Sequence, residues 1–279
     1  MKVDACIWTK NSSKFLPITL RAFEMAVPRD TLGQRIMVDD QSVDETIKIG
    51  ATHGWHTYKN PGIGIASAAN EALNHVTTPF FISIEHDIIL AKDWFTRLVP
   101  RIEDHDNVAV CQGVRVPTDK TLRAIFGLDW KTWSIDNNIY RTSVIRKLGG
   151  FPRKCDGTCT DSWLKKTVED AGFEWVIDSS VVSEHIYNGM RHYWRKEEKT
   201  KSCSCQFWQQ GRLDGFTLLF RLAVTSPIYG LQIALRHNQP KAIFAYPYHR
   251  IKLMDAWLTS TMWFPTKMGN DLHRALSNR

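Results

Sequence analysis

Polar side chains able to bind a cation or a phosphate follow each of the first four strands that the sequence predicts. They are the run Thr9 to Asn11 after the first strand, Asp39 and Asp40 after the second, Asn60 after the third, and Glu85 with Asp87 after the fourth. Ligands of parallel α/β sheets bind at the carboxyl ends of the strands. Carboxylates repel a phosphate directly, but a hard ion such as Mg²⁺ or Mn²⁺ accepts oxygens from both groups. The pattern therefore predicts a site for a divalent cation and a phosphorylated ligand.

A glycine-containing turn follows the third strand and leads into an alanine-rich helix. Asn60, Pro61, Gly62 and Gly64 form the turn, and the helix runs from Ala66 to Asn74. The turn lacks the GxGxxG order of dinucleotide-binding loops and the GK(S/T) ending of P-loops. By itself it is therefore weak support for a phosphate site.

Apolar runs and helical spacings alternate along the first half of the chain and supply the elements that carry these side chains. We expect strands at residues 3–8, 35–39 and 79–84, and a further strand that ends at residue 58. Helices are expected at residues 16–26, 44–51 and 66–74. The first helix rests on the spacing of Leu16, Leu20 and Phe23. Alternating strands and helices with short connections predict an α/β fold with a parallel sheet and right-handed crossovers.

Length and composition fit one large core, or one catalytic domain with an appendage. The chain has 279 residues, of which 43% are hydrophobic and 23% charged, which excludes disordered and collagen-like proteins. No uncharged apolar run is long enough to span a membrane, and residues 1–4 lack the features of a secretion signal. We therefore expect a cytoplasmic protein whose six cysteines, none of them in a CxxC pair, are reduced thiols.

Charge is divided unevenly along the chain. Residues 1–185 contain 22 basic and 24 acidic side chains, whereas residues 186–279 contain 14 basic and 5 acidic ones. A basic excess confined to the last third predicts an anionic surface as its partner, either phospholipid headgroups or nucleic acid. Because aromatic and leucine-rich runs alternate with the Arg and Lys residues there, we favour an anionic membrane surface and expect no nucleic acid.

The last third also carries apolar residues at helical spacing. Two such groups are Leu218, Leu219 and Leu222, and Ile228, Leu231 and Leu235. Pro227 interrupts the uncharged run between Arg221 and Arg236, which favours short amphipathic helices lying in the membrane interface. The alternative is that these helices pack on the catalytic domain.

Several blocks of sequence, taken in order, carry a resemblance to a known family. They are ACIWTKN at 5–11, MVDDQSVDET at 37–46, NPGIGIASAAN at 60–70, ISIEHD at 82–87, GGF at 149–151, TDSWL at 160–164, AGF at 171–173, and His185. In order and spacing they resemble the inverting glycosyltransferases of family 2, which have the GT-A fold. The resemblance implies a GT-A catalytic domain at residues 1–190, with a nucleotide-sugar-binding half at 1–88 and an acceptor-side half at 89–190. A basic, aromatic-rich amphipathic helical tail would follow at 191–279.

The resemblance implies a donor site around Asp39. In the family, the carboxylate after the second strand contacts the base or ribose of the nucleotide, which places Asp39 and the neighbouring Asp40 in that pocket. The implied nucleotide-sugar-binding residues are Thr9, Asn11, Asp39, Asp40, Asn60, Gly64, Asn70, Glu85 and His86.

The resemblance also implies a metal site. The family's Asp-x-Asp motif falls on Glu85, His86 and Asp87, so that Asp87 would bind the Mg²⁺ or Mn²⁺ ion that bridges the donor diphosphate. Glu85 takes the first acidic place, where the family usually has Asp, and His86 is unusual in the middle. His185 matches a histidine that approaches the metal or the diphosphate in many GT-A enzymes. A helix cap for Asp87 and a structural role for His185 are the alternatives.

The family's Glu-Asp motif falls on Thr160 and Asp161 at the start of a predicted helix, which makes Asp161 the implied general base. The preceding Glu is absent, so Asp156 is a nearby substitute, and an ordinary helix cap is the alternative role for Asp161. A helix N-terminus lowers the pKa of a carboxyl group, whereas enclosure beneath an acceptor raises it. The sequence leaves the balance open.

The resemblance implies an inverting glycosyltransferase that moves a sugar from a nucleotide-diphosphate donor to a membrane-proximal, lipid-linked or glycolipid acceptor. A group of cationic and aromatic side chains would cover the diphosphate as a mobile loop or begin the membrane-facing tail; it comprises Arg191, His192, Trp194, Arg195 and Lys196. The expected place of the protein is the cytoplasm, at the inner face of the cell membrane. The alternatives are a sugar nucleotidyltransferase and a GT-A-like membrane-binding module without catalysis.

Overall fold

The computed structural model describes residues 2–126, 133–153, 160–187 and 212–263. The contacts divide the chain into two units. The first comprises Met1–Asp119 and Phe126–Tyr187, and the second comprises Lys120–Ile125 and Asn188–Arg279. The expected domain boundary after residue 190 stays a prediction.

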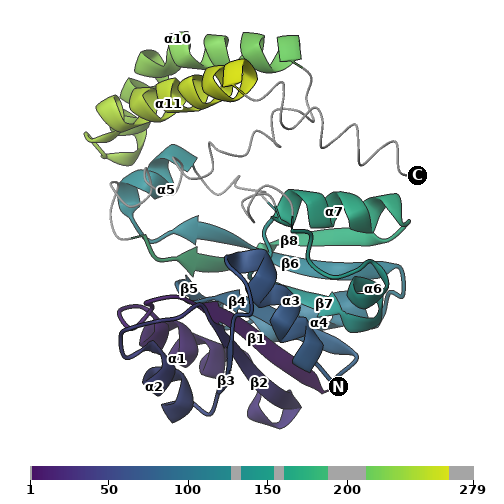
Figure 1. The fold of residues 1–279 in the computed structure, drawn as a ribbon. Coiled ribbons are helices and arrows are strands. Elements are labelled where there is room, and N and C mark those ends of the chain that lie inside the picture. Colours follow the sequence, from purple (N-terminus) through teal and green to yellow (C-terminus); the bar gives the residue numbers. More distant parts are fainter. Residues whose placement is uncertain (1, 127–132, 154–159, 188–211, 264–279) are drawn as a thin grey trace. The chain divides into compact units, whose positions relative to one another are not determined.

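The first unit is built on a mixed sheet of eight strands in the order β3-β2-β1-β4-β7-β6-β8-β5 (Figure 1). Its parallel half contains β1 Val3–Thr9, β2 Leu32–Asp39, β3 His56–Lys59 and β4 Phe80–Glu85. The connections contain α1 Leu16–Ala26, the 3-10 turn η1 Arg29–Thr31, α2 Thr46–Thr52 and α3 Ile65–His75. The predicted alternation of strands and helices is confirmed here.

The other half of the sheet adds antiparallel pairs that the sequence pattern did not predict. Its strands are β5 Ile88–Ile89, β6 Val108–Pro117, β7 Asn138–Arg141 and β8 Glu174–His185. Strand β7 lies antiparallel between β4 and β6, β8 is parallel to β6, and β5 pairs antiparallel with β8. The helices of this half are α4 Trp94–Glu103, α6 Thr142–Lys147 and α7 Thr160–Asp170. Helix α5 Lys120–Phe126 follows β6, and its residues Lys120–Ile125 belong to the second unit.

Helices cover both faces of the sheet, because successive residues of a strand point to opposite sides. On β1, Val3, Ala5 and Ile7 join one buried cluster with side chains of α1 and α4. Cys6 and Trp8 join the other cluster with side chains of α3, α6 and α7. The central strand is therefore buried on both faces, which fixes the strand ends that carry the polar residues.

The second unit contains two long helices, α10 Arg212–His237 and α11 Ala242–Trp263 (Figure 1). Pro227 does not break α10, contrary to the expected short helices on either side of it. Proline lacks the N–H that would bond to the carbonyl four residues earlier, here that of Ala223. The hydroxyl of Ser226 donates to this carbonyl at 2.5 Å instead, so the helix continues through the proline.

Helix α10 packs on α11 through small residues. Ser226, Gly230 and Ala234 recur every fourth residue and are buried. A Cβ atom on Gly230 would lie only 3.0 Å from the carbonyl oxygen of Ala242, so the two backbones approach closely. The opposite side of α10 presents exposed apolar side chains, which are Phe220, Val224, Ile228, Leu231 and Leu235. Within the described part of the chain, no helix is both long and apolar enough to cross a membrane.

Candidate active site

Glu85, Asp87 and His185 form a cluster with the chemistry of a cation site. One ligand atom of each lies within 4.8 Å of the others, and His185 Nε2 lies 3.1 Å from Asp87 Oδ2. His185 is 1% exposed and Asp87 is 7% exposed. Carboxylate oxygens suit Mg²⁺ and Mn²⁺, and imidazole nitrogen is accepted by the transition metal. These residues therefore fit the divalent ion that the sequence predicts.

Strand pairing brings this cluster together from distant parts of the chain. Strand β4 ends at Glu85, a tight turn follows, and β5 then pairs with β8 so that Ile88 lies opposite His185. The amide of Ile186 donates to the carbonyl of Asp87 at 2.8 Å, which fixes the turn against β8. His86 occupies the same turn, where its carbonyl accepts a bond of 2.9 Å from the hydroxyl of Thr19 on α1. Its ring is half-buried, and its predicted role in donor binding stays a prediction.

Asp39 is buried at the end of β2 and is held by three hydrogen bonds. The hydroxyl of Thr9 donates to Oδ1 at 2.8 Å, the amide of Ser42 donates to Oδ2 at 2.7 Å, and the hydroxyl of Ser42 donates to Oδ1 at 2.6 Å. The amide of Asn11, which has a φ of 47°, donates to the same Ser42 hydroxyl at 2.7 Å. Thr9, Asn11 and Asp39 therefore form one preorganised network.

Asp40 extends this network towards the glycine turn. Its carboxylate accepts a bond of 2.8 Å from Lys10 and one of 3.2 Å from the side-chain amide of Asn60. Asn60 also donates to the carbonyl of Gly64 at 3.2 Å, and Gly64 has a φ of 81°, which favours glycine. The turn after β3 is therefore tied to the acidic end of β2.

Asn70 is not joined to this network by any described bond. Its side-chain amide donates to the carbonyls of Ala66 and Phe151, and its oxygen accepts from the amide of Phe151. It thus ties α3 to the segment after Gly150, whose φ of 80° favours glycine. These contacts give Asn70 a structural task, and its predicted role in donor binding stays a prediction.

Asp161 lies in the first turn of α7. Its carboxylate accepts a bond of 2.7 Å from the amide of Ser162, as expected near a helix N-terminus. Burial nevertheless raises the pKa of Asp161, and the Ser162 amide and the charge of Arg115 oppose this rise only in part. Enclosure therefore outweighs the helix end in the balance that the sequence left open. The alternative base, Asp156, lies outside the described residues.

Sequence reasoning missed a buried polar segment between α5 and β7. Ser134, Asp136, Asn137 and Asn138 are each at most 2% exposed. Asp136 forms an ion pair with Arg115 of β6. Burial and the neighbouring Glu85 carboxyl raise the pKa of Asp136 to about 6, and Arg115 and His185 oppose that rise. The sequence does contain a mainly polar run, SIDNN at 134–138, next to the apolar residues of β7. Its proximity to Glu85 and Arg115, however, arises only from the pairing of the strands.

The predicted acidic residues gather at one edge of the sheet. Thr9 lies opposite Asp39 and Trp8 lies opposite Glu85, so Asp39 and Glu85 are separated by two strand spacings, roughly 10 Å. Arg115 interacts electrostatically with both Glu85 and Asp161, which brings α7 to the same region. The cation cluster and the Asp39 network thus lie at the carboxyl ends of neighbouring strands, and Asp161 shares the charge of Arg115 with Glu85. The cationic group Arg191, His192, Trp194, Arg195 and Lys196 lies outside the described residues.

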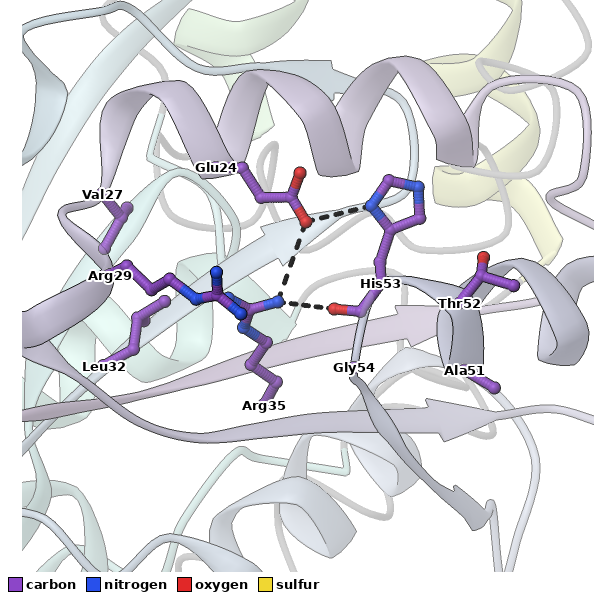
Figure 2. A pocket seen from close by; sticks show the side chains of 9 residues that line it. All are labelled: Glu24, Val27, Arg29, Leu32, Arg35, Ala51, Thr52, His53 and Gly54. Atoms are coloured by element: carbon purple, nitrogen blue, oxygen red, sulfur yellow. Dashed lines mark hydrogen bonds and ion pairs between the residues drawn. The ribbon is translucent and has the colours of Figure 1, made fainter.

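A cavity of about 450 Å³ lies elsewhere in the first unit, between α1, the start of β2 and the end of α2 (Figure 2). Arg35 donates to the carbonyl of His53 at 2.5 Å, and Glu24 lies 3.0 Å from the His53 ring (Figure 2). Arg35 precedes Asp39 by four residues on the same strand, so this cavity lies away from the carboxyl ends of the strands. It is distinct from the acidic site.

A family model described as Glycosyl transferase family 2 matches residues 4–151. This range includes Asp39, Glu85, Asp87, Arg115 and Asp136 and ends before Asp161 and His185. No curated protein matches the sequence.

Solved structures share the fold. The mannosyltransferase PcManGT from Pyrobaculum calidifontis, in complex with GDP-Man and Mn²⁺, has a TM-score of 0.65 and 19% identity, over 94% of this chain and 87% of that chain. TarS 1-349 from S. aureus has a TM-score of 0.56 and 17% identity, over 93% of this chain and 90% of that one. The same TarS fragment in complex with UDP-GlcNAc has a TM-score of 0.56 and 16% identity, over 93% and 90%.

Proposed function

The chain belongs to glycosyltransferase family 2, and from this membership we propose that it is an inverting enzyme that depends on Mg²⁺ or Mn²⁺. Its fold is the GT-A fold, and nucleotide sugars are the donors of such enzymes. The observation that carries the metal-dependent proposal is the cluster of Glu85, Asp87 and His185 beside the buried Asp39 network. The Mn²⁺ in the complex of PcManGT supports this choice of ion.

Each part of the site has a proposed task. The Asp39 network, with Asp40 and Asn60, would bind the nucleoside of the donor through fixed oxygen and amide groups. Asp87 and His185, with Glu85, would hold the ion. A bound Mg²⁺ or Mn²⁺ would neutralise charge on the diphosphate as it departs.

Asp161 would act as the general base. It would take the proton of the acceptor hydroxyl while that oxygen forms a bond to the anomeric carbon of the sugar. The bond from the anomeric carbon to the diphosphate oxygen breaks in the same displacement, and the nucleoside diphosphate leaves. One carboxylate is enough because the configuration inverts in a single step. The raised pKa of Asp161 supports this role, since it brings the base nearer to neutral pH.

We further propose a lipid-linked or glycolipid acceptor and peripheral attachment to the cytoplasmic face of the membrane. Residues 220–252 contain five Arg and Lys residues and no Asp or Glu. The exposed apolar face of α10, from Phe220 to Leu235, lies within this stretch. A cationic surface with exposed apolar side chains suits an anionic lipid surface.

Metal-dependent thermal stabilisation by a panel of GDP- and UDP-sugars would identify the donor. With that donor, Asp87→Ala and Asp161→Ala should each abolish sugar transfer while the protein stays folded. Asp93→Ala is the control, because Asp93 forms an exposed ion pair with Arg97 on α4. Wild-type activity in Asp87→Ala and Asp161→Ala would refute the assigned roles.

Release of pyrophosphate from a nucleoside triphosphate would favour the nucleotidyltransferase, and a chain inert with every donor would favour the noncatalytic module.

A further inference from the structure

The pairing of β4 with β7 brings a third carboxylate, that of Asp136, close to the cation cluster. Ser83 of β4 lies opposite Asn138 of β7 in an antiparallel register. The hydroxyl of Ser83 also donates to the carbonyl of Ile135 at 2.5 Å, so the residues before β7 remain beside β4. The Glu85 carboxyl group lies beside that of Asp136 and interacts with it.

Arg115 lies on the other side of Asp136. The guanidinium of Arg115, on β6, forms an ion pair with the Asp136 carboxylate, and the two side chains are 15% and 1% exposed. Arg115 also interacts electrostatically with Glu85 and Asp161. One partly buried cation therefore interacts with carboxylates on both the proposed donor side and the proposed acceptor side of the site. Two carboxylates in contact repel one another unless a cation compensates them.

The segment that carries Asp136 is held rigidly by its neighbours. The Asn137 side chain accepts bonds from the Trp94 indole at 2.7 Å and from the Ser183 hydroxyl at 2.9 Å, and it donates to the carbonyl of Gly113 at 2.7 Å. Its φ of 60° turns the chain so that Asp136 faces Arg115. The Trp133 indole donates to the Ser162 hydroxyl at 3.0 Å, which ties the same segment to the start of α7.

We propose that Asp136 and Arg115 are positioning residues for the cation site, in which the pair orients the Glu85 carboxylate towards Asp87 and His185. This inference rests on the proposed metal-dependent function. It also gives a reason for the Glu at position 85, because a side chain longer than Asp has more freedom and needs a support to hold it. Groups that orient metal ligands in this way typically contribute 10-fold to 100-fold to metal affinity.

The test measures Mn²⁺ binding to the full chain without any sugar donor, by calorimetric titration or by the EPR signal of free Mn²⁺. Asp136→Asn should weaken Mn²⁺ binding about 10-fold to 100-fold. Arg115→Gln distinguishes a positioning role of Arg115 from a simple effect of its positive charge, because the two predict opposite changes in Mn²⁺ affinity. Removal of a positive charge alone would tighten Mn²⁺ binding, whereas loss of the support should weaken it. Arg115→Lys keeps the charge and should show a smaller loss, and it serves as the readout if Asp136→Asn does not fold.

The matched control is the ion pair of Arg101 and Asp178, in which the Asp178 side chain is 6% exposed and the two atoms are 2.6 Å apart. This pair lies on α4 and β8 outside the cation cluster, so Asp178→Asn should leave Mn²⁺ affinity unchanged. Wild-type Mn²⁺ affinity in Asp136→Asn, or tighter binding in Arg115→Gln, would overturn the inference and leave the proposed transferase standing. Absence of Mn²⁺ binding by the wild type would overturn the inference and the metal requirement together. Sugar transfer measured with and without EDTA would then show whether the transferase itself remains.

Discussion

At the scale of single residues, the environment of Asp161 decides how well it can serve as a base. A free aspartate has a pKa near 4 and is a weak base at neutral pH. Burial at the start of α7 raises the pKa of Asp161, while the hydrogen bond from the Ser162 amide and the charge of Arg115 limit this rise. A base is most effective when its pKa approaches the working pH and it is still ionised. The same enclosure that desolvates Asp161 thus makes it better suited to accept a proton.

This environment predicts the pH dependence of transfer. The ionised form of Asp161 is the active base, so kcat/KM should be retained above its raised pKa and fall as the pH drops through it. The acidic limb should therefore lie above the ordinary aspartate value of about 4 when donor and Mn²⁺ are saturating. Asp161→Asn should lower the rate by about 10²-fold to 10⁴-fold and remove this limb. Asp170→Asn, on an exposed ion pair of the same helix, is the control. An unchanged limb in Asp161→Asn would show that another group is the base.

Some site residues could be predicted because they follow their strands directly in the sequence. Asp39 ends β2 and Glu85 ends β4, so each position was fixed once the strands were located. Arg115 and Asp136 could not be found in that way. Their relation to Glu85 arises from the antiparallel register of β7 between β4 and β6, which joins positions distant in the chain. An apolar strand carries no local signal for the direction of its partner.

At the scale of elements, the close contact of α10 and α11 depends on Gly230. A Cβ atom there would lie 3.0 Å from the carbonyl oxygen of Ala242 and 3.1 Å from that of Ile243. These are backbone atoms that cannot rotate away, so a side chain at this position requires the facing backbone to shift by a few tenths of an ångström. The prediction of short helices on either side of Pro227 was wrong because of a local contact. A hydroxyl contact at Ser226, invisible to helical periodicity, replaces the bond that proline removes.

We therefore predict that Gly230→Ala destabilises the helix pair. The steric cost should be about 1–3 kcal/mol, offset by up to about 1 kcal/mol from the better helix propensity of alanine. Hydrogen exchange of the amides of residues 220–252 should become faster in this variant. Leu231→Ala is the control, because Leu231 occupies the neighbouring position and is 48% exposed. Equal protection in Gly230→Ala and the wild type would contradict the close packing.

At the scale of the whole molecule, the two units differ in the sign of the charge at their functional surfaces. The acidic site lies in the first unit, whereas the cationic stretch 220–252 lies in the second. A transferase whose acceptor is embedded in a membrane gains from such a division. The cationic unit can remain at an anionic surface while the acidic site, which would be repelled by that surface, binds its cation and donor.

This division predicts binding to anionic vesicles through α10. Each fully buried Leu or Ile side chain contributes about 1.5–3 kcal/mol, so Ile228→Asp with Leu235→Asp should reduce vesicle binding at least about 10-fold. The matched control is Met25→Asp, which places the same charge on a 66% exposed apolar position of α1 in the first unit and should leave binding unchanged. High salt should weaken binding of the wild type, because screening reduces the attraction of its Arg and Lys residues. Sedimentation with vesicles of phosphatidylserine and phosphatidylcholine measures this. A wild type that stays in the supernatant, or that binds an oligonucleotide in a gel-shift assay instead, would reject the membrane surface as partner. The proposed sugar-transfer chemistry of the first unit would be unaffected by that result.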